Sequence, residues 1–191
     1  MKILLADDDA DRAAYLARAL RRDGDISVVC ALPGQLLHDA VALHAPDVVL
    51  VDMTRPDRDT LEGVRQLSGS RPHPVVLFVD EDDPAFMEEA IAAGVCSYNV
   101  GSVAPAEVRP VLRAAVALFH RHEQTRAALS EAEARLQERA LIDRAKAMLI
   151  RTRRCSEPEA YRWLQRQAMA GGRRLADVAR AVLQTNGEIA P

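Results

Sequence analysis

Short apolar runs and amphipathic stretches alternate along the first two thirds of the chain. Residues 48–51 and 75–79 are continuously apolar, which is typical of strands that are covered on both faces. The stretches between such runs place apolar side chains every three or four positions, as in Leu61, Val64 and Leu67, and therefore predict helices. Five strands and five helices in strict alternation predict an α/β fold, a doubly wound five-stranded parallel sheet with helices on both faces.

The pattern changes after Pro105. No Gly or Pro interrupts residues 111–151, which predicts one long helix that begins or kinks near Pro110. A weak heptad along this stretch consists of Ala115, His122, Leu129 and Leu136, with Leu118, Thr125 and Ala132 three residues after the first three. His and Thr fill a helix–helix seam poorly, so two interpretations stay open. Residues 111–140 form either a coiled-coil linker helix that pairs with a second copy, or a long solvated connector.

Two shorter amphipathic helices are predicted near the end of the chain. Ser156 and Glu159 have the spacing of a capping box at the start of the first, and the pair Gly171–Gly172 ends it. The second helix carries an apolar stripe at Leu175, Val178, Ala179, Val182 and Leu183. Because such short helices cannot bury their apolar faces alone, we expect a small three-helix module over residues 136–186.

Composition excludes several classes of protein. Hydrophobic residues make up 49% and charged residues 28% of the 191, so a disordered or fibrous chain is not expected. Neither an apolar run long enough to cross a membrane nor a signal-peptide pattern occurs, which predicts a cytoplasmic protein without a membrane partner. Cys30, Cys96 and Cys155 are odd in number and widely spaced, which argues against disulfides and against a zinc knuckle.

Charge is distributed unevenly along the chain. Residues 1–119 carry 11 basic and 19 acidic side chains, a net charge of −8, whereas residues 120–191 carry 14 and 9, a net charge of +5. An acidic domain followed by a basic one suggests two modules with different partners, and makes a polyanion a candidate partner of the second. The alternative is an accident of composition.

Three carboxylates are expected to meet at one edge of the predicted sheet. Asp7 and Asp8 end the first strand and Asp52 ends the third, and these strands are neighbours in the strand order 2-1-3-4-5. Converging carboxylates repel one another, so Mg²⁺ is the natural counter-ion, and one carboxylate is a candidate nucleophile toward a phosphoryl donor. The alternative is that all three are solvated loop residues.

Around these residues the chain resembles the receiver domain of bacterial response regulators. Residues 2–9 are similar to its opening strand and acidic pair, and residues 46–52 to its phosphoacceptor strand. The resemblance implies a flavodoxin-like receiver domain over residues 1–119, a metal ion held by the three carboxylates, and phosphorylation of Asp52.

The resemblance fails at two positions. Receivers usually carry Thr or Ser at the end of the fourth strand and Lys after the fifth, where this chain has Val79 and Gly101. Without the lysine, an aspartyl phosphate loses a charge-assisted partner typically worth about 1.5–3 kcal/mol. We therefore expect the domain to serve as a docking surface, with phosphorylation of Asp52 not its main switch.

The last fifty residues are rich in arginine, whose planar guanidinium group suits phosphate oxygens and base stacking. The candidate RNA-binding residues are Arg144, Lys146, Arg151, Arg153, Arg154, Tyr161, Arg162, Arg166, Arg173 and Arg174. Arg144, Lys146 and Arg162 are the strongest candidates among them. A solvated helix face is the alternative role of the basic residues, and core packing is the favoured role of Tyr161 and Trp163.

This basic segment resembles the ANTAR domain, a three-helix RNA-binding module of bacterial transcription antiterminators. The resemblance is carried by residues 141–150, 156–161, 164, 168–169 and 175–179. Together with the atypical receiver, it makes the chain similar to the nitrate/nitrite assimilation antiterminators, the NasT-like branch of the AmiR/NasT family. Ala147 stands where many ANTAR domains have Gly, and Gln165 stands where Arg is common.

The resemblance implies a transcription antiterminator that binds paired hairpin loops of nascent leader RNA as a homodimer. A nitrate- or nitrite-sensing inhibitory protein, or a sensor kinase, would act through the receiver-like domain. The alternative is a phosphorylation-switched two-component regulator that binds DNA, but Leu175-Ala176-Asp177 is acidic where a recognition helix needs base-reading side chains. A third interpretation is a standalone phosphotransfer enzyme or phosphatase. An enzyme of this kind is not expected, because the sequence has neither a His nucleophile in a helical stripe nor a phosphate-binding Gly loop.

Overall fold

The computed structural model describes residues 1–22, 24–32, 34–54, 58–70, 72–101 and 104–185. The last residue of the predicted range 136–186 lies outside them. The chain divides into two compact units, Met1–Glu123 and Gln124–Pro191.

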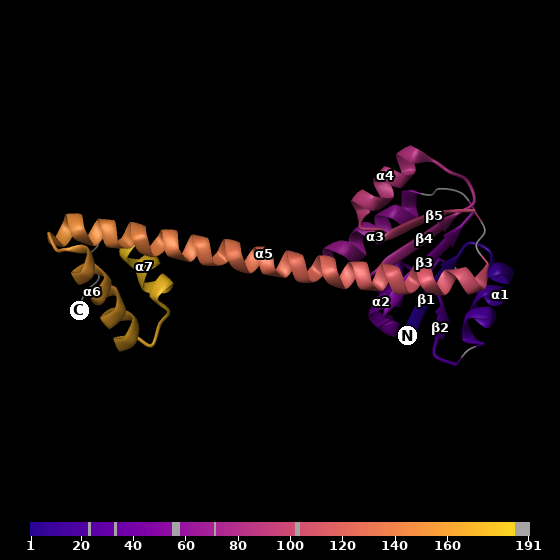
Figure 1. Ribbon diagram of the computed structural model, residues 1–191, viewed down its shortest axis with the longest axis horizontal. Coiled ribbons are helices and arrows are strands. Elements are labelled where there is room, and N and C mark those ends of the chain that lie inside the picture. The colour runs from indigo at the N-terminus through magenta and orange to yellow at the C-terminus, as the bar shows by residue number, and fades with distance from the viewer. Residues whose placement is uncertain (23, 33, 55–57, 71, 102–103, 186–191) are drawn as a thin grey trace. The chain divides into compact units, whose positions relative to one another are not determined.

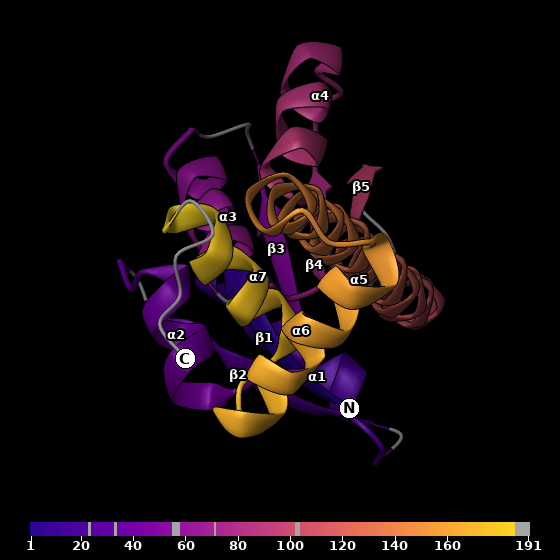
Figure 2. The ribbon, with the colours of Figure 1, turned by 90° about the vertical axis from the view of Figure 1, so that its left-hand side faces the viewer.

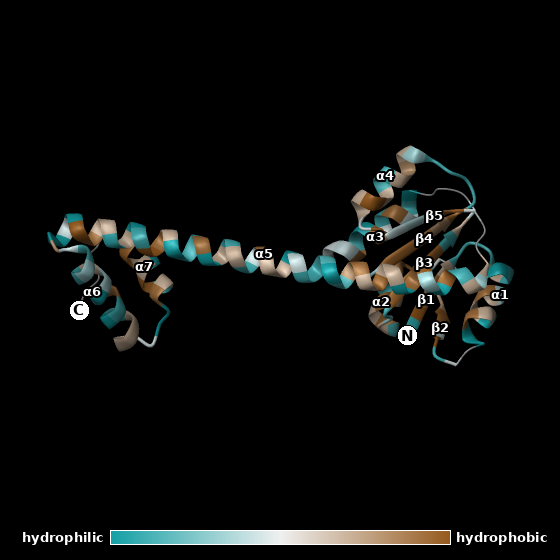
Figure 3. Ribbon diagram, viewed as in Figure 1, coloured by the Kyte–Doolittle hydropathy of each residue, from teal (hydrophilic) through white to brown (hydrophobic). Residues whose placement is uncertain are grey.

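The first unit is built on a five-stranded parallel sheet, as predicted (Figure 1). Its strands are β1 (Lys2–Asp7), β2 (Ser27–Cys30), β3 (Val48–Met53), β4 (Val75–Val79) and β5 (Ser97–Val100). Their order is β2-β1-β3-β4-β5, which is the predicted order. The central strands are strongly hydrophobic (Figure 3) and almost wholly buried, because helices cover both faces of the sheet.

Two groups of helices cover the two faces of the sheet. The helices are α1 (Ala10–Arg21), α2 (Leu37–His44), α3 (Arg58–Ser70), α4 (Pro84–Ala93) and the beginning of α5 (Pro105–Arg153). Helices α1 and α5 bury residues such as Leu20 and Leu112 against Leu50 on one face. Helices α2, α3 and α4 bury a second cluster, including Leu61 and Phe86, on the other. The doubly wound arrangement is therefore confirmed.

Helix α5 begins at Pro105, earlier than the predicted start near residue 111, and Pro110 lies inside it. Proline fits the first position of a helix because the amide there has no intrahelical partner, and Val108 anchors the added turn in the core. Ala115 is 1% exposed and packs in the same core, so the prediction that it belongs to a heptad seam is wrong.

The end of α5 packs with α6 (Glu157–Ala170) and α7 (Leu175–Gln184) around a third core (Figure 2). Leu149, Leu164 and Val178 are fully buried in it. The predicted capping box is present at the start of α6, where the Glu159 carboxylate accepts a hydrogen bond from the backbone N–H of Ser156 at 2.9 Å. The short helices thus bury their apolar faces against α5, as expected.

The remaining expectations about the whole chain concern cysteines and membranes. Cys30, Cys96 and Cys155 are free thiols. Among the described residues, no helix combines the length and the apolar character needed to cross a lipid bilayer.

Candidate functional sites

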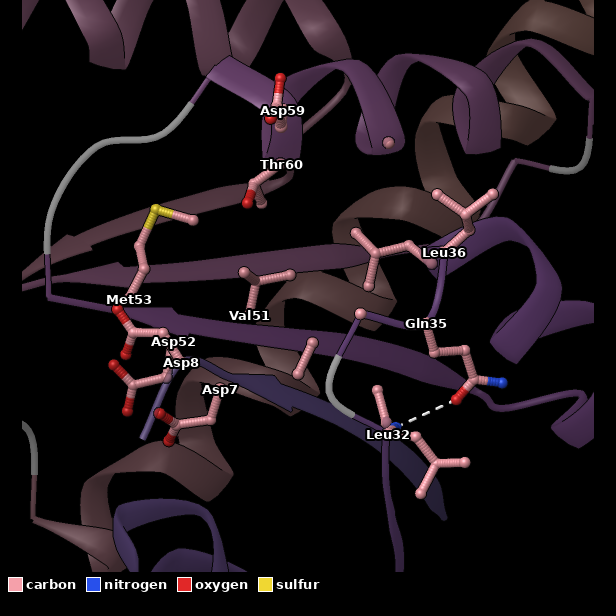
Figure 4. Close-up of a pocket in the computed structure, with 15 residues that line it drawn as sticks. Asp7, Asp8, Leu32, Gln35, Leu36, Val51, Asp52, Met53, Asp59 and Thr60 are labelled. Atoms are coloured by element: carbon pink, nitrogen blue, oxygen red, sulfur yellow. Dashed lines mark hydrogen bonds between the residues drawn. The ribbon is translucent and has the colours of Figure 1, made fainter. Parts of the chain in front are cut away.

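The carboxyl ends of β1 and β3 bring three aspartates together (Figure 4). Asp7 lies opposite Asp52 in the register of these strands, and Asp8 follows Asp7. The Asp7 side chain is fully buried and that of Asp52 is 17% exposed, whereas that of Asp8 is 50% exposed. The Asp8 carboxylate also accepts a hydrogen bond from the backbone N–H of Thr54 at 3.0 Å. The three predicted site residues therefore form one acidic cluster.

A basic residue that the sequence analysis did not single out lies inside this cluster. The Arg12 guanidinium donates to Asp7 at 2.8 Å and to Asp8 at 2.6 Å. Its Nε atom is 3.5 Å from an Asp52 oxygen, and its Nη1 atom is 3.7 Å from Asp80. Arg12 follows Asp8 by four residues on α1, and this helical spacing is the signal by which the sequence could have revealed the pair.

Electrostatics distinguish Asp52 from its neighbours. Burial raises the pKa of the Asp52 carboxyl from 3.8 to about 6, because desolvation disfavours the ionised form. The Arg12 guanidinium lowers that pKa, whereas the Asp7, Asp80 and Asp8 carboxylates raise it. The same contacts raise the pKa of Arg12, with the hydrogen bond to Asp7 as the main cause, so Arg12 stays cationic. The cluster thus contains a fixed internal cation.

The two positions that depart from receiver domains are well defined. Val79 ends β4 and is 1% exposed, so an apolar side chain takes the place of the usual hydroxyl. Gly101 follows β5 with a φ of +88°, a conformation that favours glycine and would strain a lysine. Neither position offers a side chain that can bond a phosphoryl group on Asp52.

A cavity of about 480 Å³ opens beside the aspartates (Figure 4). The acidic cluster forms one side of its lining, and Leu32, Leu36 and Val51 contribute apolar surface elsewhere. Gln35, Asp59 and Thr60 also line the cavity, so apolar and polar side chains alternate away from the acidic cluster.

In the second unit, three of the predicted RNA-binding residues are held by other groups. Lys146 forms ion pairs with Asp143 and with Glu157, both at 2.7 Å, and its side chain is 17% exposed. The Arg153 guanidinium stacks 4.3 Å from the centre of the Trp163 ring. The Nε atom of Arg162 donates to the Pro158 carbonyl at 3.2 Å. Lys146 and Arg162 were two of the three strongest candidates.

The other predicted basic residues are exposed, and the structure gives them no ion pair with any described residue. They are Arg144, Arg151, Arg154, Arg166, Arg173 and Arg174. Tyr161 is 39% exposed, so core packing is not its main role, whereas Trp163 is partly buried against the third core.

Tyr161 lines an open pocket of about 390 Å³ between α5 and α6. Arg135 and Arg139 line the same pocket, together with Lys146. The sequence did not single out either arginine, because both precede residue 141, where the residues that carry the resemblance to the ANTAR domain begin. The acidic side chains of Glu138 and Asp143 also line the pocket, and Arg135 forms an exposed ion pair with Glu131 at 2.6 Å. The pocket therefore combines an aromatic ring with side chains of both charges.

Comparison with known proteins gives each unit a family. Residues 3–113 match the response regulator receiver domain, and residues 130–183 match the ANTAR domain. The transcriptional regulatory protein PdtaR of Mycobacterium tuberculosis is 31% identical over 186 residues, which cover 97% of this chain and 91% of that protein. The chain belongs to the ANTAR response regulators.

Other relatives of this ANTAR response regulator are similar over part of the chain. The transcriptional regulatory protein RstA of Escherichia coli is 28% identical over 111 residues, covering 58% of this chain and 46% of that protein. The crystal structure of the BeF3-activated receiver domain of Klebsiella pneumoniae RstA superposes with a TM-score of 0.54 at 27% identity, covering 61% of this chain and 98% of that domain. The flavodoxin-like receiver fold of the first unit is therefore shown.

Receiver domains commonly bind Mg²⁺ at this acidic position. Mg²⁺ requires oxygen ligands at about 2.0–2.1 Å in a nearly octahedral arrangement. In this ANTAR response regulator, the oxygens of Asp7, Asp8 and Asp52 lie 2.6–3.5 Å from nitrogen atoms of Arg12 instead. No group of three or more His, Cys, Asp or Glu side chains among the described residues is placed to hold a metal ion. As arranged, the cluster does not fit Mg²⁺.

Proposed function

We propose that this ANTAR response regulator is a transcription antiterminator that binds hairpin loops of nascent leader RNA through residues 136–185. The pocket between α5 and α6 carries this proposal. It places the exposed ring of Tyr161 beside Arg139 and beside Arg135, whose ion pair with Glu131 is highly exposed and therefore weak. An aromatic ring next to arginines can receive an unstacked base and the phosphates next to it.

The exposed arginines of the second unit support the same function. Arg144, Arg151 and Arg166 have no ion pair among the described residues, so their charges are available to phosphate oxygens. By contrast, Lys146 already neutralises two carboxylates, and we assign it a structural role at the base of the pocket.

A double-helical DNA target is disfavoured by the surface of α7. A recognition helix reads bases with polar side chains near its N-terminus. Helix α7 begins with Leu175 and Ala176, and Asp177 is ion-paired with Arg180 at 2.9 Å. The first turn of α7 therefore offers no basic or amide side chain with which to read a base.

A binding titration tests the proposal. Labelled hairpin RNA and duplex DNA are titrated with the full chain at several salt concentrations. We expect tighter binding to RNA, with log affinity falling against log salt by about 0.7 per phosphate contact in a single-stranded loop. The Arg144→Ala variant reduces this slope by about one contact. Arg18→Ala, which removes an equally exposed charge from the receiver unit, leaves it unchanged. A preference for DNA would contradict the proposal.

We further propose that the receiver unit gates this activity as a docking surface for a nitrate- or nitrite-sensing inhibitory protein. Val79 and Gly101 deprive a phosphorylated Asp52 of its usual hydroxyl and lysine partners, which favours protein docking over phosphate timing. The test is readthrough of a leader terminator in transcription with purified components. We expect Asp52→Ala to retain readthrough. A folded Asp52→Ala protein that has lost readthrough would show that phosphorylation is the switch, and a sensor kinase the partner.

The biological target is open to a direct experiment. RNA that co-purifies with the protein from cells is sequenced, and leader transcripts of nitrate or nitrite assimilation genes are the expected products. The polypeptide that co-purifies in the absence of nitrate identifies the inhibitory partner. Recovery of unrelated transcripts would remove the nitrate assignment while leaving RNA binding intact.

A further inference from the structure

The acidic cluster of the receiver unit is neutralised from within the chain. Arg12 makes three hydrogen bonds to Asp7 through Nε and Nη2, and a fourth to Asp8 through Nη2. Its side chain is 28% exposed and also lies within 4 Å of Asp52 and Asp80. One guanidinium therefore contacts four carboxylates that come from the ends of three different strands.

The helix that carries Arg12 holds it in this position. Asp9 caps the N-terminus of α1 and accepts hydrogen bonds from the backbone N–H groups of Asp11 and Arg12 at 2.9 and 3.0 Å. Asp7 in turn accepts a hydrogen bond from the backbone N–H of Asp9 at 2.8 Å, which fixes the turn between β1 and α1. The capped N-terminus of α1 thus positions the Arg12 guanidinium beside the carboxylates, and these contacts require little further ordering of the chain.

We propose that Arg12 is a built-in counter-cation that replaces the divalent ion of the acidic cluster, so that Arg12 and Mg²⁺ compete for the same carboxylates. Both carboxylate oxygens of Asp7 and one of Asp8 accept hydrogen bonds from the guanidinium, and the other Asp8 oxygen accepts one from the Thr54 N–H. A metal ion therefore reaches these carboxylates only when Arg12 moves away. The apparent affinity for Mg²⁺ is then the intrinsic affinity multiplied by the fraction of molecules in which Arg12 has left the carboxylates. This fraction is small, so the apparent affinity is low. This inference concerns the receiver unit and does not depend on RNA binding.

Isothermal titration calorimetry of the full chain with MgCl₂ tests the inference. We expect weak or no saturable binding of Mg²⁺ by the wild-type protein. In Arg12→Gln we expect an affinity at least about tenfold higher, because the competing guanidinium is absent from every molecule. Arg18→Gln removes an exposed charge from the same helix and serves as the matched control, with wild-type behaviour expected. Adding Asp8→Asn to Arg12→Gln removes a ligand and abolishes the gained affinity.

A second measurement covers the case in which Arg12→Gln destabilises the receiver unit. The thermal unfolding midpoint is recorded for each variant with and without MgCl₂. We expect MgCl₂ to raise the midpoint of Arg12→Gln and to leave that of the wild-type protein nearly unchanged, because only a state that binds the ion is stabilised by it. Equal Mg²⁺ affinity in the wild-type protein and Arg12→Gln would overturn the inference, and so would an Arg12→Gln protein that gains no affinity.

Discussion

At the residue scale, Asp52 is a carboxyl whose ionisation destabilises the folded state. Its pKa of about 6 in the folded protein exceeds the ordinary value of 3.8, mainly because the side chain is buried. Between these pH values the folded protein holds more protons than the unfolded chain, so the Asp52 contribution to stability falls as the pH rises. Arg12 opposes this effect by favouring the ionised form.

We therefore expect Asp52→Asn to stabilise the protein at neutral pH. Asparagine carries no charge to bury, so the free energy of unfolding exceeds the wild-type value at pH 7. The excess shrinks as the pH falls through about 6, and vanishes near the ordinary pKa of aspartate. Urea denaturation over this pH range measures the difference. Asp25→Asn, at an exposed position, is the control. An excess that does not change with pH would show that burial of the charge is not its cause.

Arg154 offers a second test at this scale, because it occupies a strained backbone position. Its φ of +48° lies in the left-handed region, which costs a non-glycine residue about 1 kcal/mol relative to glycine. We expect Arg154→Gly to raise the free energy of unfolding by about that amount and Arg154→Ala to leave it unchanged. Both variants lose the same charge, so both bind hairpin RNA more weakly. If Arg154→Gly is stabilised and binds RNA as tightly as the wild-type protein, Arg154 does not contact the RNA.

A site residue could be predicted from the sequence when the fold class alone determines its position, and could not when its partner comes from another helix. Asp7 and Asp52 were predictable because the ends of neighbouring parallel strands meet whatever the details of packing. The partners of Lys146 and Arg153 were not, because Glu157 and Trp163 come from another helix and only the folded module brings them close. Counting arginines identified a basic module but could not separate free charges from paired ones.

At the element scale, the paired Lys146 links α5 to α6. Hydrogen bonds to Asp143, on its own helix, and to Glu157, on α6, raise the pKa of the Lys146 ammonium. The two carboxylates are themselves more than half exposed, so solvent screens the pairs. Lys146 therefore contributes modestly to stability and has little charge left for a phosphate.

We expect Lys146→Ala to lower the free energy of unfolding by less than about 1 kcal/mol, the usual range of exposed ion pairs. It should reduce the salt dependence of RNA binding less than Arg144→Ala does, because Arg144 has no ion pair among the described residues. Denaturation and salt-dependent titrations of the two variants provide the comparison. A larger loss of salt dependence in Lys146→Ala would mean that RNA displaces Asp143 and Glu157.

Element boundaries were less predictable than element types. The strands and helices of the receiver unit followed from apolar periodicity, since both faces of the sheet are buried. The start of α5 did not, because Pro110 reads as a helix boundary, yet the buried residues Val108 and Leu112 on either side hold it in the helix. The heptad pattern also extended too far, since it included Ala115, which the receiver core buries.

At the scale of the whole molecule, the two units divide the charge and the proposed tasks. The acidic receiver unit encloses its own counter-cation, and the basic ANTAR unit presents free arginines. Helix α5 contributes side chains to the cores of both units, and its exposed part carries a spaced row of leucines. Leu118, Leu129 and Leu136 are 59%, 59% and 68% exposed in the single chain. Covering these apolar side chains with a second copy of the chain removes them from water and stabilises the dimer.

We expect a homodimer through this segment of α5, and its loss in the double variant Leu129→Lys/Leu136→Lys. Lysine at both positions places like charges opposite each other at the seam, which opposes pairing. Ala127→Lys/Ala134→Lys introduces the same charges on the opposite side of the helix and serves as the control. Sedimentation equilibrium should show monomers for the first variant and dimers for the second and for the wild-type protein. Because two RNA-binding units in one particle engage paired hairpins with higher avidity, the monomeric variant should bind a two-hairpin RNA about 10²–10⁴-fold more weakly while its affinity for a single hairpin is unchanged. A leucine variant that remains dimeric would place the dimer interface outside this row.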